Sequence, residues 1–503
     1  MTSKRRRSGE SVATSLDGYD ASLKETPEHT ADQRAIELSR REEVINIPTL
    51  PDEPINGGKY FFTVNPAEVE SYTLPFFKFP ARFFPLVPRW VIQHHSKPDD
   101  SVLDPFCGSG SALVESKILG RTSFGVDIDP LGRFLTKVKT TPIHPDRLDS
   151  AWKVLEKALS GTERRWNAKD MKKRDLDSEA MQDEIDRLGL NKYLPGFVNN
   201  PPYWFRNYVL LELAIMKKAV MELPSEHDGD CSDFFLGCFA STIRNSSNAD
   251  PSAVSGLEYT KRMRQRDEEG RIVDPLRAFR KRVEARIEQM QSFYEACARN
   301  GVLETPARVL GEDIMELNKY LETIERAGDI DLIVTSPPYC TAIEYYRRHK
   351  LELVWLQEKT GLRTFEDVTK HSKHYIGRYT AAAGTLINDQ GSDMLRYVLG
   401  SIEKLDHARA KAVSTYFYEM KEAFQQMNLA LRKGGIAAIV IGDSTSKGIR
   451  VPTSDIYIDL ASKTSLSLKT SFSYVIRNRI MQFPRKNRGG TIDFEKILVF
   501  QKS

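Results

Sequence analysis

The chain of 503 residues is 40% hydrophobic and 28% charged, which excludes fibrous, collagen-like and wholly disordered proteins and favours two or three domains. Its 73 basic residues nearly balance its 69 acidic ones, for a formal net charge of +4, so any attraction to a polyanion must come from local clusters of charge. Five cysteines without a close-spaced pair argue against disulfides and structural zinc, and no apolar run approaches the roughly 20 residues that cross a bilayer. A reducing cytoplasm is the expected location.

The beginning of the chain, residues 1–50, is predicted to be a disordered tail. Up to about Arg41 it is rich in Ser, Thr, Glu, Lys and Arg and poor in aromatic residues, so it buries too little apolar surface to offset the entropy lost on ordering. The basic cluster Lys4–Arg7 is not followed by an apolar stretch, which argues against a secretory signal. Ordered structure is expected from near Tyr60.

Residues 51–149 are predicted to form the first half of an α/β domain and contain one clear supersecondary unit. Ser101–Asp104 has the apolar pattern of a short buried strand and leads into a glycine-rich turn. Ala112–Leu119 has apolar residues at helical spacing and ends at Gly120, and Ser123–Asp127 has the pattern of a second strand. The order is therefore strand, glycine-rich turn, helix, strand.

The glycine-rich turn is suited to hold a ligand. It consists of Asp104, Pro105, Phe106, Cys107, Gly108, Ser109 and Gly110. Glycines at such a turn let a ligand approach the main chain, and the carboxylate of Asp127, at the end of the next strand, can accept hydrogen bonds from ribose hydroxyls. A dinucleotide-binding G-x-G-x-x-G fingerprint that starts at Gly108 needs a glycine where this chain has Leu113. This difference argues against a dehydrogenase.

Residues 150–305 are predicted to be a helical insertion, because strand patterns nearly vanish there. Amphipathic helical patterns cover four segments: Ser178–Leu188, Tyr208–Leu223, Phe234–Ile243 and Leu276–Cys297. Two clusters of basic residues, Lys261–Arg266 and Arg277–Arg286, are suited to contact phosphates, and a solvated helix face accounts for them equally well.

Alternation between strands and helices resumes in the second half of the α/β domain, residues 306–503. Strand patterns occupy Arg308–Ile314, Ile330–Thr335 and Gly435–Ile441, a helix is expected at Phe417–Leu431, and an antiparallel pair closes the chain at Ser473–Phe483 and Glu495–Gln501. Strands that alternate with helices predict a parallel sheet covered by helices. The fold class is therefore α/β, a doubly wound Rossmann-like sheet interrupted by the helical insertion.

The strand at Ile330–Thr335 leads directly into a polar turn with two prolines: Ser336, Pro337, Pro338 and Tyr339. The exocyclic amine of a base is a poor nucleophile because its lone pair is delocalised into the ring. A catalyst must therefore hold the amine protons, and the Ser336 hydroxyl and the Pro337 carbonyl are two suitable acceptors. The prolines fix φ near −65° and make these acceptors rigid. Tyr339 offers a face on which a base swung out of a duplex can stack.

The two motifs together resemble the amino-methyltransferases of DNA, which methylate N4 of cytosine or N6 of adenine. In that family, the turn Asp104–Gly110, with Phe106, Gly108 and Gly110, corresponds to the cofactor-binding loop, and Thr335–Tyr339 corresponds to the catalytic turn. The resemblance covers roughly residues 60–140 and 305–503. It implies a Rossmann-like methyltransferase sheet and S-adenosyl-L-methionine as the cofactor, with no metal.

Further cofactor-binding residues are implied by the resemblance. Asp127 falls where the family holds the ribose hydroxyls, and Asp313 falls where a side chain meets the adenine amine. Phe79 and Pro80, in the sequence Phe79-Pro80-Ala81-Arg82, resemble an additional cofactor-binding segment. The stretch Ala342–Trp355 resembles the segment after the catalytic turn in some members; it contains Tyr345, Arg348, His349 and Lys350.

The order of the motifs is similar to that of the group whose target-recognition region lies between the two motif halves. The insertion precedes the strand that leads to Asp313 rather than coming after it, so assigning residues 150–305 to target recognition is an inference. The resemblance implies a prokaryotic, DNA-associated protein that acts on double-stranded DNA. It leaves open a cognate restriction endonuclease as partner, the recognition sequence and the oligomeric state.

Serine before the double proline is the form that this family usually pairs with N4 of cytosine, so a cytosine-N4 DNA methyltransferase is the favoured function. An adenine-N6 DNA methyltransferase is the first alternative, although aspartate is usual there. An RNA guanine-N2 methyltransferase shares loops such as Asp104–Gly110 but usually has Asp or Asn before the double proline. A nucleic-acid-binding protein without catalysis would bind the cofactor without turnover.

Other candidate sites are weaker. Asn200-Pro201-Pro202-Tyr203 also matches the amino-methyltransferase pattern, but the preceding Leu190–Val198 contains Asn, Lys, Pro and Gly rather than a buried strand. We therefore expect this turn to be the entry to a helix. No Pro-Cys dipeptide occurs, which argues against covalent catalysis through Cys340. His94 and His95 are expected to face solvent near a helix end.

Overall fold

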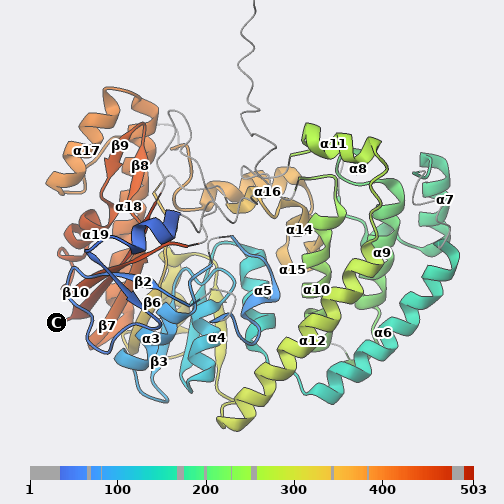
Figure 1. Cartoon of the computed structure of the whole chain (residues 1–503), viewed down its shortest axis with the longest axis horizontal. Coiled ribbons are helices and arrows are strands. Elements are labelled where there is room, and N and C mark those ends of the chain that lie inside the picture. The colour runs from blue at the N-terminus through green and yellow to red at the C-terminus, as the bar shows by residue number, and fades with distance from the viewer. Residues whose placement is uncertain are drawn as a thin grey trace, which may run out of the picture.

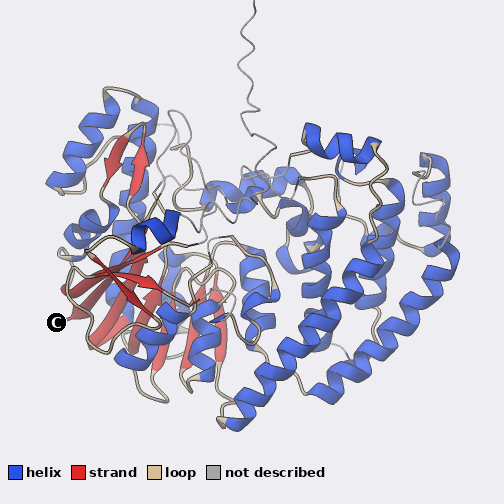
Figure 2. Ribbon diagram, viewed as in Figure 1, coloured by secondary structure: helices blue, strands red, loops and turns tan. Residues whose placement is uncertain are grey.

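The computed structural model describes residues 34–64, 69–80, 82–166, 175–196, 201–227, 229–250, 258–340, 345–381, 385–477 and 492–503. A sheet with its covering helices makes up one half of the molecule, and a group of helices makes up the other (Figures 1 and 2). Among the described residues, no helix is both long and apolar enough to cross a membrane.

The central sheet has nine strands and is parallel except for one of them. Its spatial order is β1 (Val44–Ile47), β2 (Lys59–Phe62), β10 (Leu466–Val475), β11 (Phe494–Lys502), β7 (Leu431–Ile441), β6 (Ile330–Thr335), β3 (Ser101–Asp104), β4 (Thr122–Val126) and β5 (Ala307–Gly311). Only β11 runs antiparallel to its neighbours within this sheet. The predicted doubly wound α/β sheet is confirmed. The predicted strand at Ser473–Phe483 starts earlier, at Leu466, and its residues from 478 on lie outside the described part of the chain.

Alternate side chains of the central strands pack on opposite faces of the sheet. Leu103 and Ile333 belong to one buried cluster, whose helices are α13 (Leu317–Glu322), α17 (Asp393–Glu403), α18 (His407–Ala430) and α19 (Thr453–Ala461). Val102 and Leu332 belong to the cluster on the other face, with α3 (Leu86–His95) and α4 (Ser111–Ile118). This alternation follows from the two-residue period of a strand that is buried on both faces. A separate hairpin pairs β8 (Ser444–Ser446) with β9 (Ile449–Val451).

Ordered structure begins earlier than the sequence predicted. Val44 and its neighbours form β1, which pairs in parallel with β2, although they fall within the expected tail 1–50. The physical reason is a small apolar cluster in which Ala35, Leu38 and Val44 pack with Phe61. The expected start near Tyr60 is therefore wrong, while residues 1–33 lie outside the described residues.

The insertion is helical wherever the structure describes it. Its helices are α6 (Pro145–Trp166), α7 (Ser178–Leu188), α8 (Pro201–Trp204), α9 (Asn207–Met221), α10 (Asp230–Ser246), α11 (Lys261–Glu268) and α12 (Pro275–Arg299). All four helices predicted there are present, with boundaries within a few residues. The remaining helices are α5 (Pro130–Thr140), α14 (Lys350–Trp355), α15 (Gln357–Thr360) and α16 (Phe365–His371), and the short 3-10 turns are Leu74–Phe76, Asn191–Tyr193, Ser225–His227, Ile314–Glu316, Tyr345–Arg347 and Ser372–His374.

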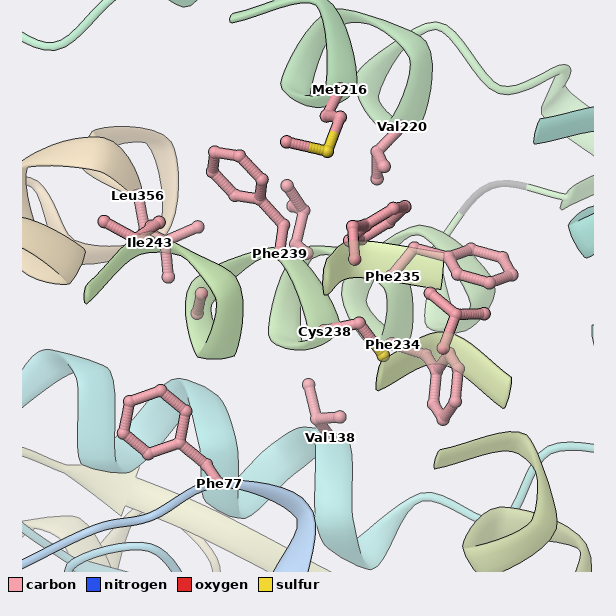
Figure 3. Packing of buried hydrophobic residues seen from close by; sticks show 14 of the residues in the cluster. Phe77, Val138, Met216, Val220, Phe234, Phe235, Cys238, Phe239, Ile243 and Leu356 are labelled. Atoms are coloured by element: carbon pink, nitrogen blue, oxygen red, sulfur yellow. The ribbon is translucent and has the colours of Figure 1, made fainter. Parts of the chain in front are cut away.

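The insertion and the sheet half share one apolar core (Figure 3). In Figure 3, Cys238 of α10 lies between helix α9, which carries Met216 and Val220, and Val138 of α5. Gly237 of α10 brings this helix close to the loop before α3, since a Cβ there would lie 2.7 Å from the ring of Phe76. The insertion is therefore packed on the sheet half through buried side chains.

The chain reverses its direction across the sheet between β3 and β6. From β3 it proceeds outward through β4 to β5, and from β6 it proceeds to the other side through β7. Val102 and Leu103 of β3 pair directly with Leu332 and Ile333 of β6. In open α/β sheets, ligands bind beyond the carboxyl ends of the strands at such a switch point.

Candidate active site

A cavity lies at the carboxyl ends of the strands around this switch point. The space that its lining residues border, with the open mouth included, is about 880 Å³. Its lining residues are Phe79, Pro80, Pro105, Phe106, Gly108, Asp127, Ile128, Asp129, Glu312, Asp313, Ile314, Ser336, Pro337, Pro338, Tyr339, His374, Tyr375 and Ile376. Every residue predicted for the site lines it except Asp104 and Gly110, and these two build the loop beneath. Residues of six segments that are separate in the sequence thus meet at one cavity.

The glycine loop, residues 104–110, is held from below by α5. The Thr136 hydroxyl donates to the Gly108 carbonyl at 3.0 Å, and the buried Lys139 ammonium donates to the Ser109 carbonyl at 2.6 Å. Gly110 has φ +78°, and a Cβ there would lie 2.7 Å from Thr136. A residue with a side chain at position 110 would therefore be strained and would also clash with α5.

Asp127 lies beside the glycine loop and accepts two main-chain hydrogen bonds. The N–H of Gly108 donates to one carboxylate oxygen at 2.7 Å, and the N–H of Asp129 donates to the other at 2.8 Å. Burial and the nearby charge of Asp129 raise the pKa of Asp127 to about 6, while these two N–H groups oppose the rise. Each oxygen keeps a second lone pair, so the carboxylate can accept further hydrogen bonds from a ligand in the cavity.

Asp104 joins the glycine loop to the double-proline turn, residues 336–339. The Thr335 hydroxyl donates to Asp104 Oδ1 at 2.6 Å, and the N–H of Phe106 donates to the same oxygen at 3.1 Å. Asp104 and Thr335 are both buried, and burial raises the pKa of Asp104 to about 7. The two motifs are therefore fixed to each other by a side-chain hydrogen bond as well as by the pairing of β3 with β6.

Thr335→Val is expected to lower the free energy of unfolding by about 1–3 kcal/mol, because it removes a donor from a buried carboxylate at nearly constant shape. Thr335→Ser keeps the hydroxyl and serves as the matched control. Hydrogen bonds to the ionised carboxylate are stronger, so the difference between the two variants is largest above pH 7 and shrinks as the pH falls through the pKa of Asp104. Urea unfolding measured above and below pH 7 checks this, and equal stabilities above pH 7 would contradict it.

The double-proline turn is anchored at its main chain and at its tyrosine. The Tyr416 hydroxyl donates to the Pro338 carbonyl at 2.9 Å and lies 2.5 Å from the Tyr457 hydroxyl. The Tyr339 hydroxyl donates to Glu495 on β11, a carboxyl whose pKa is raised by burial. The Ser336 hydroxyl, in contrast, lines the cavity and makes no hydrogen bond to another described residue. It is left available to a ligand.

Asp313 lies across the cavity at the end of β5. Its carboxylate accepts from the N–H of Met315 at 2.9 Å and so caps the short turn Ile314–Glu316. Glu312 forms an ion pair with Arg133 at 3.0 Å. The guanidinium of Arg133 also donates to the Asp127 carbonyl at 2.7 Å, which ties the ends of β4 and β5 together.

A buried ion pair next to the cavity was missed by the sequence analysis. His349 Nε2 lies 2.5 Å from Asp129, which also caps α5. Burial lowers the pKa of His349, but the Asp129 carboxylate outweighs this and raises the pKa above the ordinary value. The imidazole stacks on Phe79, with ring centroids 5.2 Å apart. The signals were present, since Asp129 precedes a proline at a helix start and His349 lies in the stretch after the double-proline turn, but the 220-residue separation hid their pairing.

The wall formed by His374, Tyr375 and Ile376 was also missed. Arg378 holds this segment by an ion pair of 2.9 Å with Glu419 on α18, and the same guanidinium donates to the Lys373 carbonyl at 3.0 Å. Burial raises the pKa of Glu419 to about 7. No local pattern marks such a wall, because it depends on contacts between distant segments.

The weaker candidates do not line the cavity. Pro201–Trp204 forms α8 in the insertion, as the expected entry to a helix, and Tyr203 does not line the cavity, while Asn200 lies outside the described residues. Cys340 is buried, and burial raises the pKa of its thiol to about 12. This thiol is therefore not activated as a nucleophile.

The two histidines at the end of α3 differ in exposure. His94 is exposed, as expected, and its ring stacks on Trp90 with centroids 4.6 Å apart. His95 is half-buried and packs edge-on against the same indole, and burial lowers its pKa to about 4. The expectation that His95 faces solvent is therefore wrong, because the side chain turns towards Trp90.

Comparisons with known proteins find similarity to DNA methyltransferases. Residues 25–131 match the family model of the N6/N4 methyltransferases, described as DNA methylase. The chain is 26% identical over 427 residues to the Type II methyltransferase M.MvaI of Kocuria varians, a match that covers 81% of this chain and 85% of that protein. It is 21% identical over 397 residues to the Type II methyltransferase M.BsoBI of Geobacillus stearothermophilus, a match that covers 73% of each chain. These two similarities span most of the chain rather than a single motif.

Proposed function

We propose that this chain, which is similar to the DNA amino-methyltransferases that act on N6 or N4, methylates N4 of cytosine in duplex DNA with the Ser336–Tyr339 turn as its catalytic turn. One observation carries the proposal. The double-proline turn and the glycine loop open onto the same cavity and are linked by the hydrogen bond between Thr335 and Asp104. An amine held at the turn would therefore face a methyl donor held at the loop.

The lining of the cavity fits S-adenosylmethionine, the methyl donor of this family. In this proposal, the Asp127 carboxylate accepts hydrogen bonds from the two ribose hydroxyls and the Asp313 carboxylate accepts one from the adenine amine. Phe106, Ile128 and Ile314 supply apolar surface for a flat ring. Gly108, with φ +49°, leaves the main chain open to the ligand next to Phe79. When bound, the cofactor supplies an electrophilic methyl group.

The residues of the turn would make the amine a better nucleophile. In this proposal, the Ser336 hydroxyl accepts one amine proton and the Pro337 carbonyl accepts the other, which localises the lone pair towards the methyl donor. Tyr339 provides the face on which the flipped base stacks. Its ring is held by the hydrogen bond from its hydroxyl to Glu495, and a Cβ at Gly442 would lie 3.5 Å from the ring.

The choice of cytosine rests on Ser336. A neutral hydroxyl before the double proline is the form that the family usually pairs with cytosine N4, and the hydroxyl is free to accept within the described residues. The description of the matching family model as DNA methylase, and the names of the two relatives as Type II methyltransferases, support DNA as the substrate.

Incubation with labelled S-adenosylmethionine and unmethylated duplex DNA is expected to yield N4-methylcytosine on nucleoside mass spectrometry. Transfer RNA serves as the parallel substrate, on which no transfer is expected. N6-methyladenine in the DNA arm would overturn the cytosine assignment while leaving the catalytic turn in place. Transfer to guanine in the RNA arm alone would overturn the assignment to DNA.

A further inference from the structure

An aromatic and cationic surface lies on the insertion, formed by Tyr203 of α8, Tyr259, and Lys261 and Arg264 of α11. We call these four residues the α11 strip. Tyr203 is 36% exposed, and Lys261 and Arg264 are exposed. In Figure 1, α8 and α11 lie next to each other at the upper end of the helical half. The strip includes the tyrosine of the second double-proline motif, which the catalytic site does not use.

The members of the strip are in contact with each other. The Arg264 guanidinium lies over the ring of Tyr259 at 5.2 Å, and this ring packs edge-on against Tyr203 with centroids 5.9 Å apart. The Tyr259 hydroxyl donates to Asp267 at 2.7 Å. Met263 is the buried residue of α11. The cation is therefore presented on a rigid aromatic platform rather than on a mobile side chain.

Nearby carboxylates are engaged by other cations. Asp250 forms an ion pair with Arg262 at 2.7 Å. Asp267 is paired with Arg206 at 2.8 Å and with Arg271 at 2.5 Å. Lys261 and Arg264 therefore keep a positive surface at the first turns of α11, while Glu268 lies at the end of the helix.

The strip is connected to the wall of the active site. Trp204, next to Tyr203, packs against Phe365 with ring centroids 6.3 Å apart, and Phe365 begins α16. Helix α16 is followed directly by Ser372–His374, and His374, Tyr375 and Ile376 line the cavity. Figure 1 shows α16 between the two halves of the molecule and α8 beside it. A partner bound at the strip would thus lie near the segment that borders the active site.

The second basic cluster has a different role. On α12, Arg280 forms an ion pair with Glu156 at 3.0 Å, Arg282 donates to the Ser241 carbonyl at 2.7 Å, and Arg286 donates to the Phe76 carbonyl at 2.7 Å. Arg280 and Arg282 therefore join α12 to other helices of the insertion, and Arg286 joins it to the loop before α3. Arg277 and Lys281 of α12 are exposed and provide a charge-matched control for the strip.

We propose that the α11 strip contacts the phosphate backbone of duplex DNA. This inference rests on the proposed function for its choice of partner, because flexible exposed cations neutralise phosphates and a rigid guanidinium on an aromatic ring can follow the sugar-phosphate chain. In this proposal Tyr203 contributes to DNA binding and takes no part in methyl transfer.

The test compares Lys261→Ala/Arg264→Ala with Arg277→Ala/Lys281→Ala, two variants that each remove two exposed cations from the insertion. Binding to an unmethylated mixed-sequence duplex is measured by fluorescence anisotropy over a series of salt concentrations. The strip variant is expected to reduce the slope of log affinity against log salt by roughly 0.9 for each lost phosphate contact, so by nearly two units. The α12 variant is expected to keep the wild-type slope. Arg262 is left unchanged because its removal would also take away its ion pair with the buried Asp250.

Equal slopes for the two variants, or an unchanged slope for the strip variant, would overturn the inference. Calorimetry with S-adenosylmethionine provides the folding control, since neither variant touches the cavity. Because DNA binding is measured directly, the inference can fail while the wild type still methylates DNA. Failure of the proposed function would appear instead as absent methyl transfer by the wild type. A strip effect on structured RNA with none on duplex DNA would also overturn the choice of partner.

Discussion

Ser336→Ala is expected to lower the single-turnover rate of methyl transfer by about 10²–10³-fold at saturating DNA and S-adenosylmethionine, the cost of removing one preorganised polar contact from a transition state. Ser336 lines the cavity, and its hydroxyl makes no hydrogen bond to another described residue. Its loss should therefore affect the reaction and not the fold. Rapid-quench measurement of methyl transfer gives the rate of the chemical step.

Two companion variants make this result specific. Ser336→Thr keeps a hydroxyl and is expected to retain much more activity than the alanine variant. Tyr203→Ala, in the second double-proline motif, should leave the chemical step nearly intact once DNA is saturating. Cofactor affinity should be unchanged in all three variants. If Ser336→Ala reacts at the wild-type rate while Tyr203→Ala abolishes the chemical step, the catalytic turn has been assigned wrongly, and the cytosine assignment fails with it.

Tyr339 needs a more careful substitution because its hydroxyl is engaged with Glu495. Removing the ring takes away a stacking platform worth roughly 1–3 kcal/mol per base, but it also removes a donor from a buried carboxyl. Tyr339→Phe retains the ring and loses only the hydrogen bond. The platform is supported if the Phe variant keeps most of the catalytic rate that the Ala variant loses.

Asp127→Ala is expected to weaken S-adenosylmethionine binding by about 1.5–3 kcal/mol for each charge-assisted hydrogen bond lost, which is tenfold or more in the dissociation constant for one bond. The carboxylate also accepts from the N–H groups of Gly108 and Asp129, so part of the loss comes from a loosened glycine loop. Calorimetry measures the affinity. Thermal unfolding without cofactor shows how much the glycine loop itself is destabilised. Unchanged affinity for S-adenosylmethionine in a folded variant would show that Asp127 does not bind the ribose.

The raised pKa of Asp127 leads us to expect that the affinity for S-adenosylmethionine depends on pH. The pKa of Asp127 is raised to about 6, and only the ionised form accepts at both oxygens without donating. Affinity is therefore expected to be full above pH 6 and to fall as the pH decreases through this value. In Asp127→Ala this decrease should disappear, and any dependence that remains near pH 7 would belong to other groups such as Asp104.

The sequence predicted those parts of the fold that depend on local patterns. The strand at Ile330–Thr335 has the predicted boundaries because the apolar run Leu332–Val334 is followed closely by a double proline, which cannot continue a strand pairing. The backbone of the glycine loop is left-handed at positions 108 and 110, a conformation that favours glycine. The two glycines therefore marked the loop in the sequence. Both motifs come directly after neighbouring strands, so their meeting at one cavity follows from the topology.

The parts that were missed depend on contacts between distant residues. The early residues of β10, which include Ser467 and Lys469, are polar and exposed on the outer part of the sheet, so no periodicity marked the start at Leu466. In the same way, Arg282 and Arg286 look like a phosphate-binding face in the sequence. In the structure, Arg282 donates to a carbonyl of α10 and Arg286 donates to the Phe76 carbonyl. These bonds depend on how α12 packs, which the sequence does not reveal.

If the insertion reads the target sequence, as the order of the motifs leads us to expect, the core that Val138 and Phe76 share with α10 limits how this protein can acquire a new recognition sequence. An insertion can be exchanged as a unit only if the surface that it covers on the rest of the protein is polar. Removal of α9, α10 and α12 would instead expose the apolar side of α5, including Val138 and Leu135. It would also leave the Phe76 carbonyl without the Arg286 guanidinium. Grafting the insertion of a relative would require the glycine loop's supporting helix to be redesigned with it. Changes of specificity are therefore expected to arise through single substitutions on outward-facing helices such as α11, which contribute little to this core.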